Sequence, residues 1–319
     1  MQNKNLLRTI DVSHGTTHDG PGMRTTVFVK GCPLHCVWCQ NPESISPHNE
    51  VWWSAADCIG CGSCREVCRS GAVSLEDTGI RILREVCQKC GACAEACPTT
   101  AMSLQGQEYD LEALLSEVLR DRSYYRQFGG GVTCSGGEPL LQVEFVSAFF
   151  KRLREEGITT ALDTCGFAPR SHLDMVLPYT DYVLYDVKLL DSELHKAYTG
   201  APNERILSNL RFVADYIRNI QPSMRMWIRT PLIPGITATE ENVQSIGAFI
   251  RDHILDVIER WELCAFNGVC VSKYDKLGVT WPFEGQGAMT QSEIQRIREV
   301  ACSTVPAHKV LITGMIRSD

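Results

Sequence analysis

The sequence GCPLHCVWCQ, residues 31–40, carries three cysteines, Cys32, Cys36 and Cys39, separated by three and then by two residues. Three thiolates at this spacing can hold three corners of a four-iron cluster and leave the fourth iron open, whereas a plain ferredoxin cluster takes four thiolates. A zinc site usually needs a fourth Cys or His nearby. His35 is a candidate for that role, but an ordinary loop position is the favoured interpretation. Because an open iron can bind a small molecule, the triplet favours catalysis over electron storage.

Two further cysteine runs follow, at residues 58–68 and 87–97, and both have x2, x2, x3 spacing. This is the bacterial two-cluster ferredoxin pattern, in which the fourth cysteine of each run binds the cluster of the other run. One predicted cluster takes Cys58, Cys61, Cys64 and Cys97. The other takes Cys87, Cys90, Cys93 and Cys68. Zinc ribbons rarely need eight thiolates in tandem, so the runs favour iron–sulfur clusters over zinc.

Eleven of the sixteen cysteines lie in these three runs, so the cysteine content indicates metal binding rather than a disulfide framework. The first residues, MQNKNLLRTIDVSH, lack the apolar core of a signal peptide, and no apolar stretch approaches the roughly 18 residues that cross a bilayer. We therefore expect a cytoplasmic protein without a membrane partner. The net charge of −7 gives no basic surface for nucleic acid. Buried, small apolar positions are expected for Cys134, Cys165, Cys264, Cys270 and Cys302.

The domain organisation follows from a change of pattern. Residues 52–104 are predicted to form an inserted domain whose core comes largely from its two clusters, because so short a segment buries little apolar surface. Residues 1–51 and 105–319 alternate between strand and helix patterns, with helices expected at 111–119, capped by Asp110, and at 142–156. Strands are expected at 24–30, 131–135, 158–164, 182–188, 224–230, 261–266 and 309–313. This alternation predicts an α/β fold with a parallel sheet and right-handed crossovers.

Chemistry-bearing residues follow the predicted strands, and parallel α/β folds place their sites at the C-terminal strand ends. These residues are the three-cysteine loop, Ser135 to Pro139, Asp163 with Thr164, Asp186 with Lys188, Arg229 and Asn267. Each one alone would be explained as a capping or solvated polar residue. Six strand ends in register with the three-cysteine loop predict a single site instead.

These motifs resemble the radical S-adenosylmethionine (SAM) superfamily, whose signature is Cys-x3-Cys-x2-Cys, and within it the activating enzymes of glycyl radical enzymes. The narrower resemblance is carried by HDGPGMRTTVFVKGC (18–32), WCQNPES (38–44), VTCSGGEPL (132–140), DTCG (163–166) and YDVK (185–188). The resemblance covers nearly the whole chain. It implies a partial (β/α)6 TIM-like barrel with an inserted ferredoxin-like domain, because many family members carry such an insert after the triplet.

The resemblance also implies an activity. In this family the amino and carboxylate groups of SAM chelate the open iron, one electron cleaves the sulfonium, and a 5′-deoxyadenosyl radical takes a hydrogen atom from a glycine of a partner glycyl radical enzyme. It implies three [4Fe-4S] clusters in all and flavodoxin or ferredoxin as reductant. The two insert clusters would relay electrons, stabilise the fold or help to dock the partner. Partners of such activators are lyases that act on choline, diols, isethionate or arylacetates.

Individual site residues are likewise implied by the resemblance. Contacts with SAM are implied for Trp38, Cys39, Gln40, Gly136, Gly137, Glu138, Asp163, Asp186, Val187, Lys188, Arg229 and Asn267. Of these, residues 136–138 resemble the backbone site for the methionine amino group, and Asn267 stands where pyruvate formate-lyase activators have a His. In some members, the residues matching Asp163, Thr164 and Asp186 also hold a monovalent cation. The element that meets the partner's glycine loop is matched by Asp19, Gly20, Pro21 and Gly22, which also fit a tight turn.

Two other functions remain open. A radical SAM enzyme could act directly on a small molecule or peptide, and against it stand the DGPG context of residues 19–22 and the lack of a long C-terminal substrate domain. A non-catalytic iron–sulfur electron carrier would account for the two ferredoxin-type runs. It would leave the βα scaffold without a role.

Overall fold

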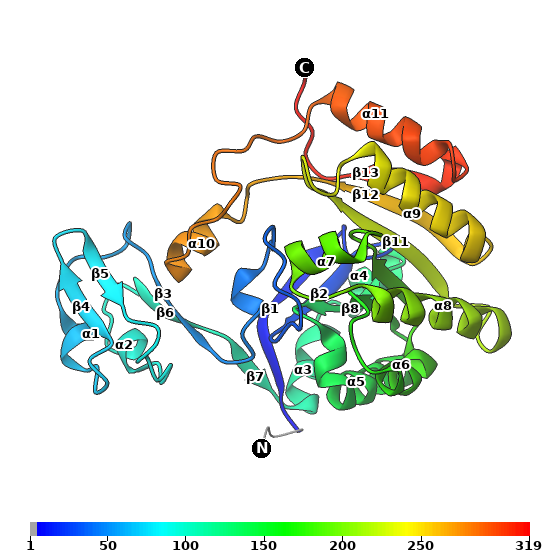
Figure 1. The fold of residues 1–319 in the computed structure, drawn as a ribbon. Coiled ribbons are helices and arrows are strands. Elements are labelled where there is room, and N and C mark those ends of the chain that lie inside the picture. Colours follow the sequence, from blue (N-terminus) through cyan, green and yellow to red (C-terminus); the bar gives the residue numbers. More distant parts are fainter. Residues whose placement is uncertain (1–4) are drawn as a thin grey trace.

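The computed structural model describes residues 5–319, and a mixed nine-stranded sheet forms its centre (Figure 1). The strand order is β13-β12-β11-β10-β9-β8-β2-β1-β7. Neighbouring strands from β2 to β13 in this order are parallel, whereas β1 and β7 are antiparallel additions at one edge. The predicted α/β fold with a mostly parallel sheet is confirmed.

All seven predicted strands are present. Their bounds are β2 (Arg24–Val29), β8 (Gly131–Gly136), β9 (Thr159–Thr164), β10 (Tyr182–Asp186), β11 (Arg225–Leu232), β12 (Ile258–Ala265) and β13 (Val310–Thr313). Strand β13 is a seventh parallel strand beside the six that the family resemblance implies. The edge strands β1 (Leu7–Thr16) and β7 (Gln107–Tyr109) were not predicted. Because β2 is buried along almost its whole length, the sheet is covered on both faces there, as expected for a parallel sheet.

Helices connect the parallel strands and bury their apolar faces against the sheet. Their bounds are α3 (Leu111–Leu119), α4 (Arg122–Phe128), α5 (Val143–Glu155), α6 (Arg170–Val176), α7 (Ser192–Thr199), α8 (Glu204–Asn219), α9 (Glu240–His253), α10 (Val271–Leu277) and α11 (Gln291–Cys302). As predicted, the Asp110 carboxylate caps α3 by accepting from Ala113 N. Gly157 follows the end of α5 with a left-handed φ of 71°. Within residues 5–319, no helix combines the length and the apolar character needed to cross a membrane.

The cysteine-rich insert projects away from the central sheet (Figure 1). It contains β3 (Glu50–Trp53), α1 (Ser63–Glu66), β4 (Val73–Glu76), β5 (Gly79–Ile82), α2 (Ala92–Glu95) and β6 (Met102–Gln105). Strands β3 and β6 pair antiparallel, which brings the two ends of the insert together, and β4 and β5 form a hairpin. The insert has a small hydrophobic cluster of its own, made of Val51, Cys64, Val73, Ile80, Cys93 and Met102.

The two cysteine runs of the insert adopt the same backbone conformation, 29 residues apart (87 − 58). Gly62 and Gly91 precede α1 and α2 with left-handed φ angles of 80° and 82°. At two further equivalent positions the first run has glycine and the second run has a residue with a side chain. The pairs are Gly60 (φ 68°) with Lys89 (φ 54°) and Gly71 (φ 66°) with Thr100 (φ 59°). The second run therefore holds two side chains in a conformation that favours glycine.

Candidate active site

A pocket of about 350 Å³ lies at the C-terminal ends of the parallel strands. This volume falls within the roughly 300–1,000 Å³ that is usual for small-molecule sites. Most of the predicted site residues line it: Asp19, Cys32, Cys36, Trp38, Cys39, Gln40, Gly136, Gly137, Asp163, Thr164, Asp186, Lys188 and Arg229. The structure thus brings together residues from the three-cysteine loop and from four of the strand ends that follow it.

The three-cysteine loop is fixed by its backbone to the C-terminal end of α7. His35 N donates to Thr199 O at 2.7 Å, and Val37 N donates to Tyr198 O at 3.1 Å. The His35 side chain is exposed and is not among the residues that line the pocket. Its position therefore agrees with an ordinary loop residue.

The thiols of this loop have strongly perturbed acidities. Burial raises the pKa of Cys36 to about 12 and raises the pKa of Cys39 further, although the Lys188 cation acts in the opposite direction on Cys36. A hydrogen bond with Cys165 lowers the pKa of Cys32. Buried thiols of this kind become thiolates when a metal replaces their protons. Three thiols on one pocket wall are the donor set that an open-iron cluster requires.

The glycine pair after β8 allows two chain segments to approach closely. A side chain at Gly136 would place its Cβ 2.4 Å from Val29 N, and one at Gly137 would place it 2.2 Å from Gly31 O. Gly137 N donates to Val29 O at 2.8 Å. Glycine is therefore required where the end of β8 meets the start of the three-cysteine loop.

Glu138 lies beneath the pocket wall rather than in the pocket. Its buried carboxylate accepts from Thr164 Oγ1 at 2.7 Å, from Cys165 N at 2.8 Å and from Leu140 N at 3.0 Å. Burial raises its pKa. The side chain ties the end of β8 to the end of β9, and Glu138 N donates to Gly31 O at 2.8 Å, so the backbone carbonyl of Glu138 is the group left for a ligand.

Two ion pairs occupy the charged side of the pocket. Asp163 Oδ2 lies 3.2 Å from Arg229 Nη1, and Asp186 Oδ2 lies 2.5 Å from Lys188 Nζ. Burial acts to lower the pKa of Lys188, but the adjacent Asp186 carboxylate and nearby thiols outweigh burial, and the pKa is raised overall. The ammonium therefore remains charged. The two carboxylates of the predicted cation site therefore each have a cationic side chain beside them.

Arg229 has a donor that is not engaged. Its Nε is buried and has no hydrogen-bond partner among the residues that the structure describes, since Glu262 Oε2 is 3.6 Å away. Buried donors of this kind usually have a partner. The donor set of the pocket therefore fits an anionic group, such as a carboxylate, as a ligand.

Two predicted contacts lie beside the pocket. Val187 is buried, and its backbone N donates to Arg229 O at 2.9 Å. Asn267 O accepts from Gln40 Nε2 at 3.2 Å, so the loop after β12 does reach the three-cysteine loop.

Of the DGPG segment, Asp19 alone lines the pocket. Its carboxylate accepts from Thr26 Oγ1 at 3.0 Å and its carbonyl accepts from Thr133 Oγ1 at 2.6 Å. Gly20 and Gly22 have φ angles of 122° and 71°, as a tight turn requires. The turn therefore presents one carboxylate to the pocket.

Sequence reasoning missed several residues of the site. Cys165 and Cys264, which were expected only as buried apolar residues, line the pocket, and Glu262 lies behind Arg229. The sequence did contain a signal for Glu262 and Cys264. They are two residues apart in β12, and alternate residues of a strand share a face. A buried acid within the apolar stretch WELCAF could have indicated the pocket face of that strand.

The structure also tests for single-ion sites. Across residues 5–319, no three His, Cys, Asp or Glu side chains lie close enough together to hold one metal ion. A four-iron cluster spreads its thiolate ligands around a body of iron and sulfide, so its ligands need not converge as those of one ion do.

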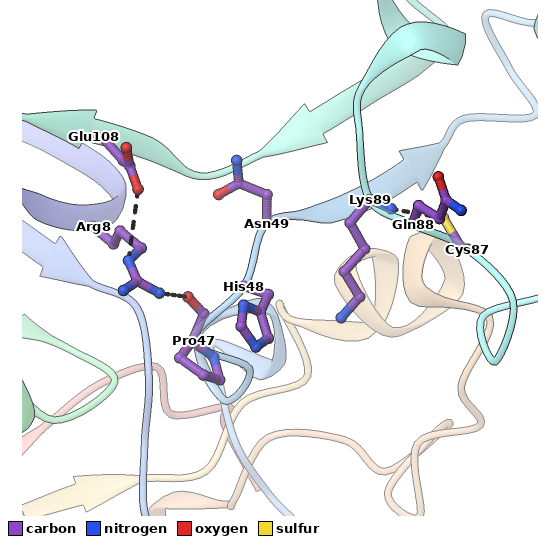
Figure 2. Close-up of a pocket in the computed structure, with 8 residues that line it drawn as sticks. All are labelled: Arg8, Pro47, His48, Asn49, Cys87, Gln88, Lys89 and Glu108. Atoms are coloured by element: carbon purple, nitrogen blue, oxygen red, sulfur yellow. Dashed lines mark hydrogen bonds and ion pairs between the residues drawn. The ribbon is translucent and has the colours of Figure 1, made fainter. Parts of the chain in front are cut away.

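A second pocket, of about 400 Å³, lies between the insert and the edge of the sheet (Figure 2). It is lined by Arg8, Pro47, His48, Asn49, Cys87, Gln88, Lys89 and Glu108. Arg8 spans it by donating to Pro47 O at 2.7 Å and lies 3.7 Å from Glu108. Cys87, Gln88 and Lys89 line this pocket together with Arg8 of β1 and Glu108 of β7, so this part of the second cysteine run lies on the side of the insert that faces the sheet.

Comparison with known proteins agrees with this geometry. The family model described as the Radical SAM superfamily matches residues 26–245. The chain is 38% identical to the (2S)-3-sulfopropanediol dehydratase activating enzyme of Klebsiella oxytoca, over 91% of this chain and 92% of that protein. It is 40% identical to the (2S)-3-sulfopropanediol sulfolyase activating enzyme of Bilophila wadsworthia, over 86% and 90%. It is 35% identical to the trans-4-hydroxy-L-proline dehydratase activating enzyme of Clostridioides difficile, over 91% and 93%.

Among solved structures, a domain of the pyruvate-formate lyase-activating enzyme from Bacteroides vulgatus aligns with a TM-score of 0.47 and 29% identity, covering 58% of this chain and all of that one. The sequence relatives and the family model identify the class of protein. The chain belongs to the radical SAM superfamily and, within it, to the activating enzymes of glycyl radical enzymes.

Proposed function

We propose that this chain activates a partner glycyl radical enzyme from the pocket at the C-terminal strand ends. The observation that carries the proposal is that the thiols of Cys32, Cys36 and Cys39 share one pocket with the glycine pair after β8 and with two cationic side chains. A [4Fe-4S] cluster held by these thiols would supply the electron that cleaves SAM to a 5′-deoxyadenosyl radical, which takes a hydrogen atom from the partner's glycine.

The chain's own residues bind and orient SAM. Arg229, with its unpartnered Nε, and Lys188 provide positive charge for the methionine carboxylate. The backbone of Gly136 and Gly137, which both line the pocket, receives the amino group. Trp38 and Gln40 flank the third cysteine and orient the adenosyl group. Apolar pocket residues, including Phe28 and Leu34, limit water.

The finer architecture is part of the proposal. The parallel sheet acts as a partial (β/α)6 barrel formed by residues 1–51 and 105–319, and residues 52–104 form a ferredoxin-like domain. The matching backbone of the two cysteine runs supports a two-cluster insert. The clusters would be held by Cys58, Cys61, Cys64 and Cys97, and by Cys87, Cys90, Cys93 and Cys68. Flavodoxin or ferredoxin would supply electrons.

The partner belongs to the range of enzymes that the relatives activate. Their names cover sulfopropanediol, isethionate, hydroxyproline, choline and indoleacetate enzymes, at 35 to 40% identity. Because these identities are similar, a panel of such enzymes is the suitable test for the partner. We propose that the DGPG turn meets the partner's glycine loop, since Asp19 faces the pocket.

The first test is anaerobic iron reconstitution followed by dithionite reduction and measurement of SAM cleavage. Three four-iron clusters correspond to about twelve irons per chain, and the wild type should form 5′-deoxyadenosine. A Cys36→Ala variant should lose cleavage and keep about eight irons, since the insert is untouched. A glycyl radical signal with one member of the panel would then identify the partner. A wild type with about eight irons and no cleavage would contradict the proposal and favour an electron carrier.

A further inference from the structure

Helix α10 lies between the insert and the three-cysteine loop, within the segment that joins β12 to α11 (Figure 1). It packs against β3 of the insert and against the short helical turn η1 (Pro42–Ser44), which follows the three-cysteine loop. One short helix thus contacts both the insert and the segment that follows the three-cysteine loop.

Two side chains of α10 contact residues 39–43, which contain the last cysteine of the loop and the residues that follow it. Tyr274 OH donates to the Cys39 carbonyl at 3.0 Å. Lys273 Nζ lies 2.6 Å from Asn41 Oδ1 and 2.7 Å from Glu43 Oε1. Glu43 is only 4% exposed, and a buried carboxylate without a cation is costly. The conformation of residues 39–43 therefore depends on α10.

The Tyr274 hydroxyl is held in place independently of this loop. The Tyr274 ring stacks on Trp281 with a centroid distance of 5.6 Å, and Trp281 stacks on Phe266 at 5.7 Å. This aromatic packing fixes the ring from the side of β12. A Tyr274→Phe change therefore removes the hydrogen bond and retains the packing.

On the side of the insert, Arg84 connects α10 to β3. Its Nη2 donates to Lys276 O at 3.0 Å, and its Nη1 donates to Val51 O at 3.1 Å. The Lys276 ammonium also lies 5.0 Å from the centre of the Trp52 ring, within the range of a cation–π contact. The C-terminal end of α10 is therefore fixed to the insert by backbone and side-chain contacts.

We propose that α10 positions the cluster-binding loop relative to the insert, with Tyr274 and Lys273 as positioning residues for residues 39–43. The inference rests on the proposed function in one respect, namely that Cys39 is a cluster ligand. The peptide that Tyr274 holds lies between Trp38 and Gln40, the proposed adenosyl contacts. Loss of this hydrogen bond should therefore weaken SAM binding more than it slows the chemical step.

The experiment compares Tyr274→Phe with wild type in the iron-reconstituted enzyme. Hydrogen exchange of the peptide covering residues 36–45 should rise by roughly three- to tenfold, the range that one hydrogen bond of ordinary net strength represents. Exchange of the α10 amides should stay unchanged, because the ring packing is kept. The KM for SAM should rise by a similar factor, with kcat within about twofold. Tyr124→Phe is the matched control, since Tyr124 is an exposed tyrosine of α4.

A second variant tests the connection to the insert. Arg84→Met removes the contacts with Lys276 O and β3, although the hydrogen-bond and ion-pair partners of Arg84 in the described part of the chain, Val51 O, Lys276 O and Glu50, lie outside residues 36–45. The hydrogen-exchange rate of residues 36–45 should rise in this variant too. In the double variant with Tyr274→Phe, the fold-increase in that rate should be smaller than the product of the two single fold-increases.

The inference is overturned if Tyr274→Phe leaves exchange of residues 36–45 at the wild-type rate, or if Arg84→Met acts within the insert alone. Exchange is measured without SAM, so it does not depend on cleavage. A chain that shows the exchange changes but cleaves no SAM would refute the proposed function and support the positioning role.

Discussion

Arg229 Nη1 lies 3.2 Å from Asp163 Oδ2, and this ion pair joins the ends of β11 and β9 across β10. The same carboxylate accepts from Ser135 Oγ at 2.6 Å. On its other side, Arg229 Nε lies 3.6 Å from Glu262 Oε2, and both acids are largely buried. A single guanidinium therefore lies between two carboxylates, of which Glu262 has a second cation, Arg260 Nη1, 3.5 Å away.

Replacing Arg229 should be costly for stability. An Arg229→Met variant leaves Asp163 and Glu262 without their shared cation, and breaking a buried pair in this way costs about 3 kcal/mol. Anaerobic urea unfolding of the reconstituted enzyme measures the change. Arg229→Lys keeps the charge and should lose about half as much or less. An Arg229→Met variant that unfolds at the wild-type urea concentration would show that the pair contributes little.

The acid partner of this pair predicts a pH dependence. Burial raises the pKa of Asp163 from 3.8 to about 6, although Arg229 acts in the opposite direction. Between these values the folded state binds more protons than the unfolded chain, so this contribution to stability is present at low pH and is lost as the pH rises through 6. An Asp163→Asn variant cannot ionise and should lack this loss.

The pH prediction is measured by urea unfolding of the reconstituted wild type and Asp163→Asn from pH 5 to pH 7.5. The free energy of unfolding of the wild type should fall relative to the variant by on the order of 1–2 kcal/mol across this interval. Parallel curves for the two proteins would contradict a raised pKa for Asp163.

The sequence predicts the parallel part of the sheet well, because each strand is a short apolar run bounded by helical periodicity. It does not predict β1, whose stretch LRTIDVSHGT mixes buried, half-buried and exposed residues, and whose outer side pairs with β7 over residues 7–9 alone. Edge strands expose one side to solvent and so have a weaker pattern. Helix α10 was also missed, because its contacts with Cys39 and the insert join residues far apart in the chain.

The candidate site divides in the same way. The cysteine spacing and the glycine pair could be read locally, since Cys32, Cys36 and Gly137 act through spacing or the absence of a side chain. Cys264 and Glu262 could not be assigned in this way, because their roles depend on which face of β12 points toward the pocket. Glu138 shows the converse, because its motif indicates a ligand contact whereas its carboxylate is bound by Thr164 and two backbone amides.

The close approach at Gly137 predicts a loss of function from a single methyl group. In Gly137→Ala the new Cβ would lie 2.2 Å from Gly31 O and 3.1 Å from Ser44 O, and both are backbone atoms. The start of the three-cysteine loop must move, which costs about 1–3 kcal/mol of stability. Where the displaced loop raises the activation free energy by about 1 kcal/mol, SAM cleavage falls roughly fivefold. Gly287→Ala is the control, since its Cβ meets nothing within 4 Å. Equal activity of the two variants would contradict a steric role for Gly137.

The left-handed residues of the second cysteine run predict a stabilising substitution. Thr100 has a φ of 59° where the first run has Gly71, and a β-branched residue in this conformation is strained by about 1 kcal/mol or more. Its hydroxyl donates to the carbonyl of the adjacent Thr99 and forms no other hydrogen bond within residues 5–319, so little is lost when the side chain is removed. Thr100→Gly should therefore raise the melting temperature of the reconstituted enzyme, even though glycine increases the entropy of the unfolded chain. The matched variant Thr99→Gly, at a residue outside the left-handed region, should lower it. If both variants lower the melting temperature alike, backbone strain at Thr100 does not limit the stability of the insert.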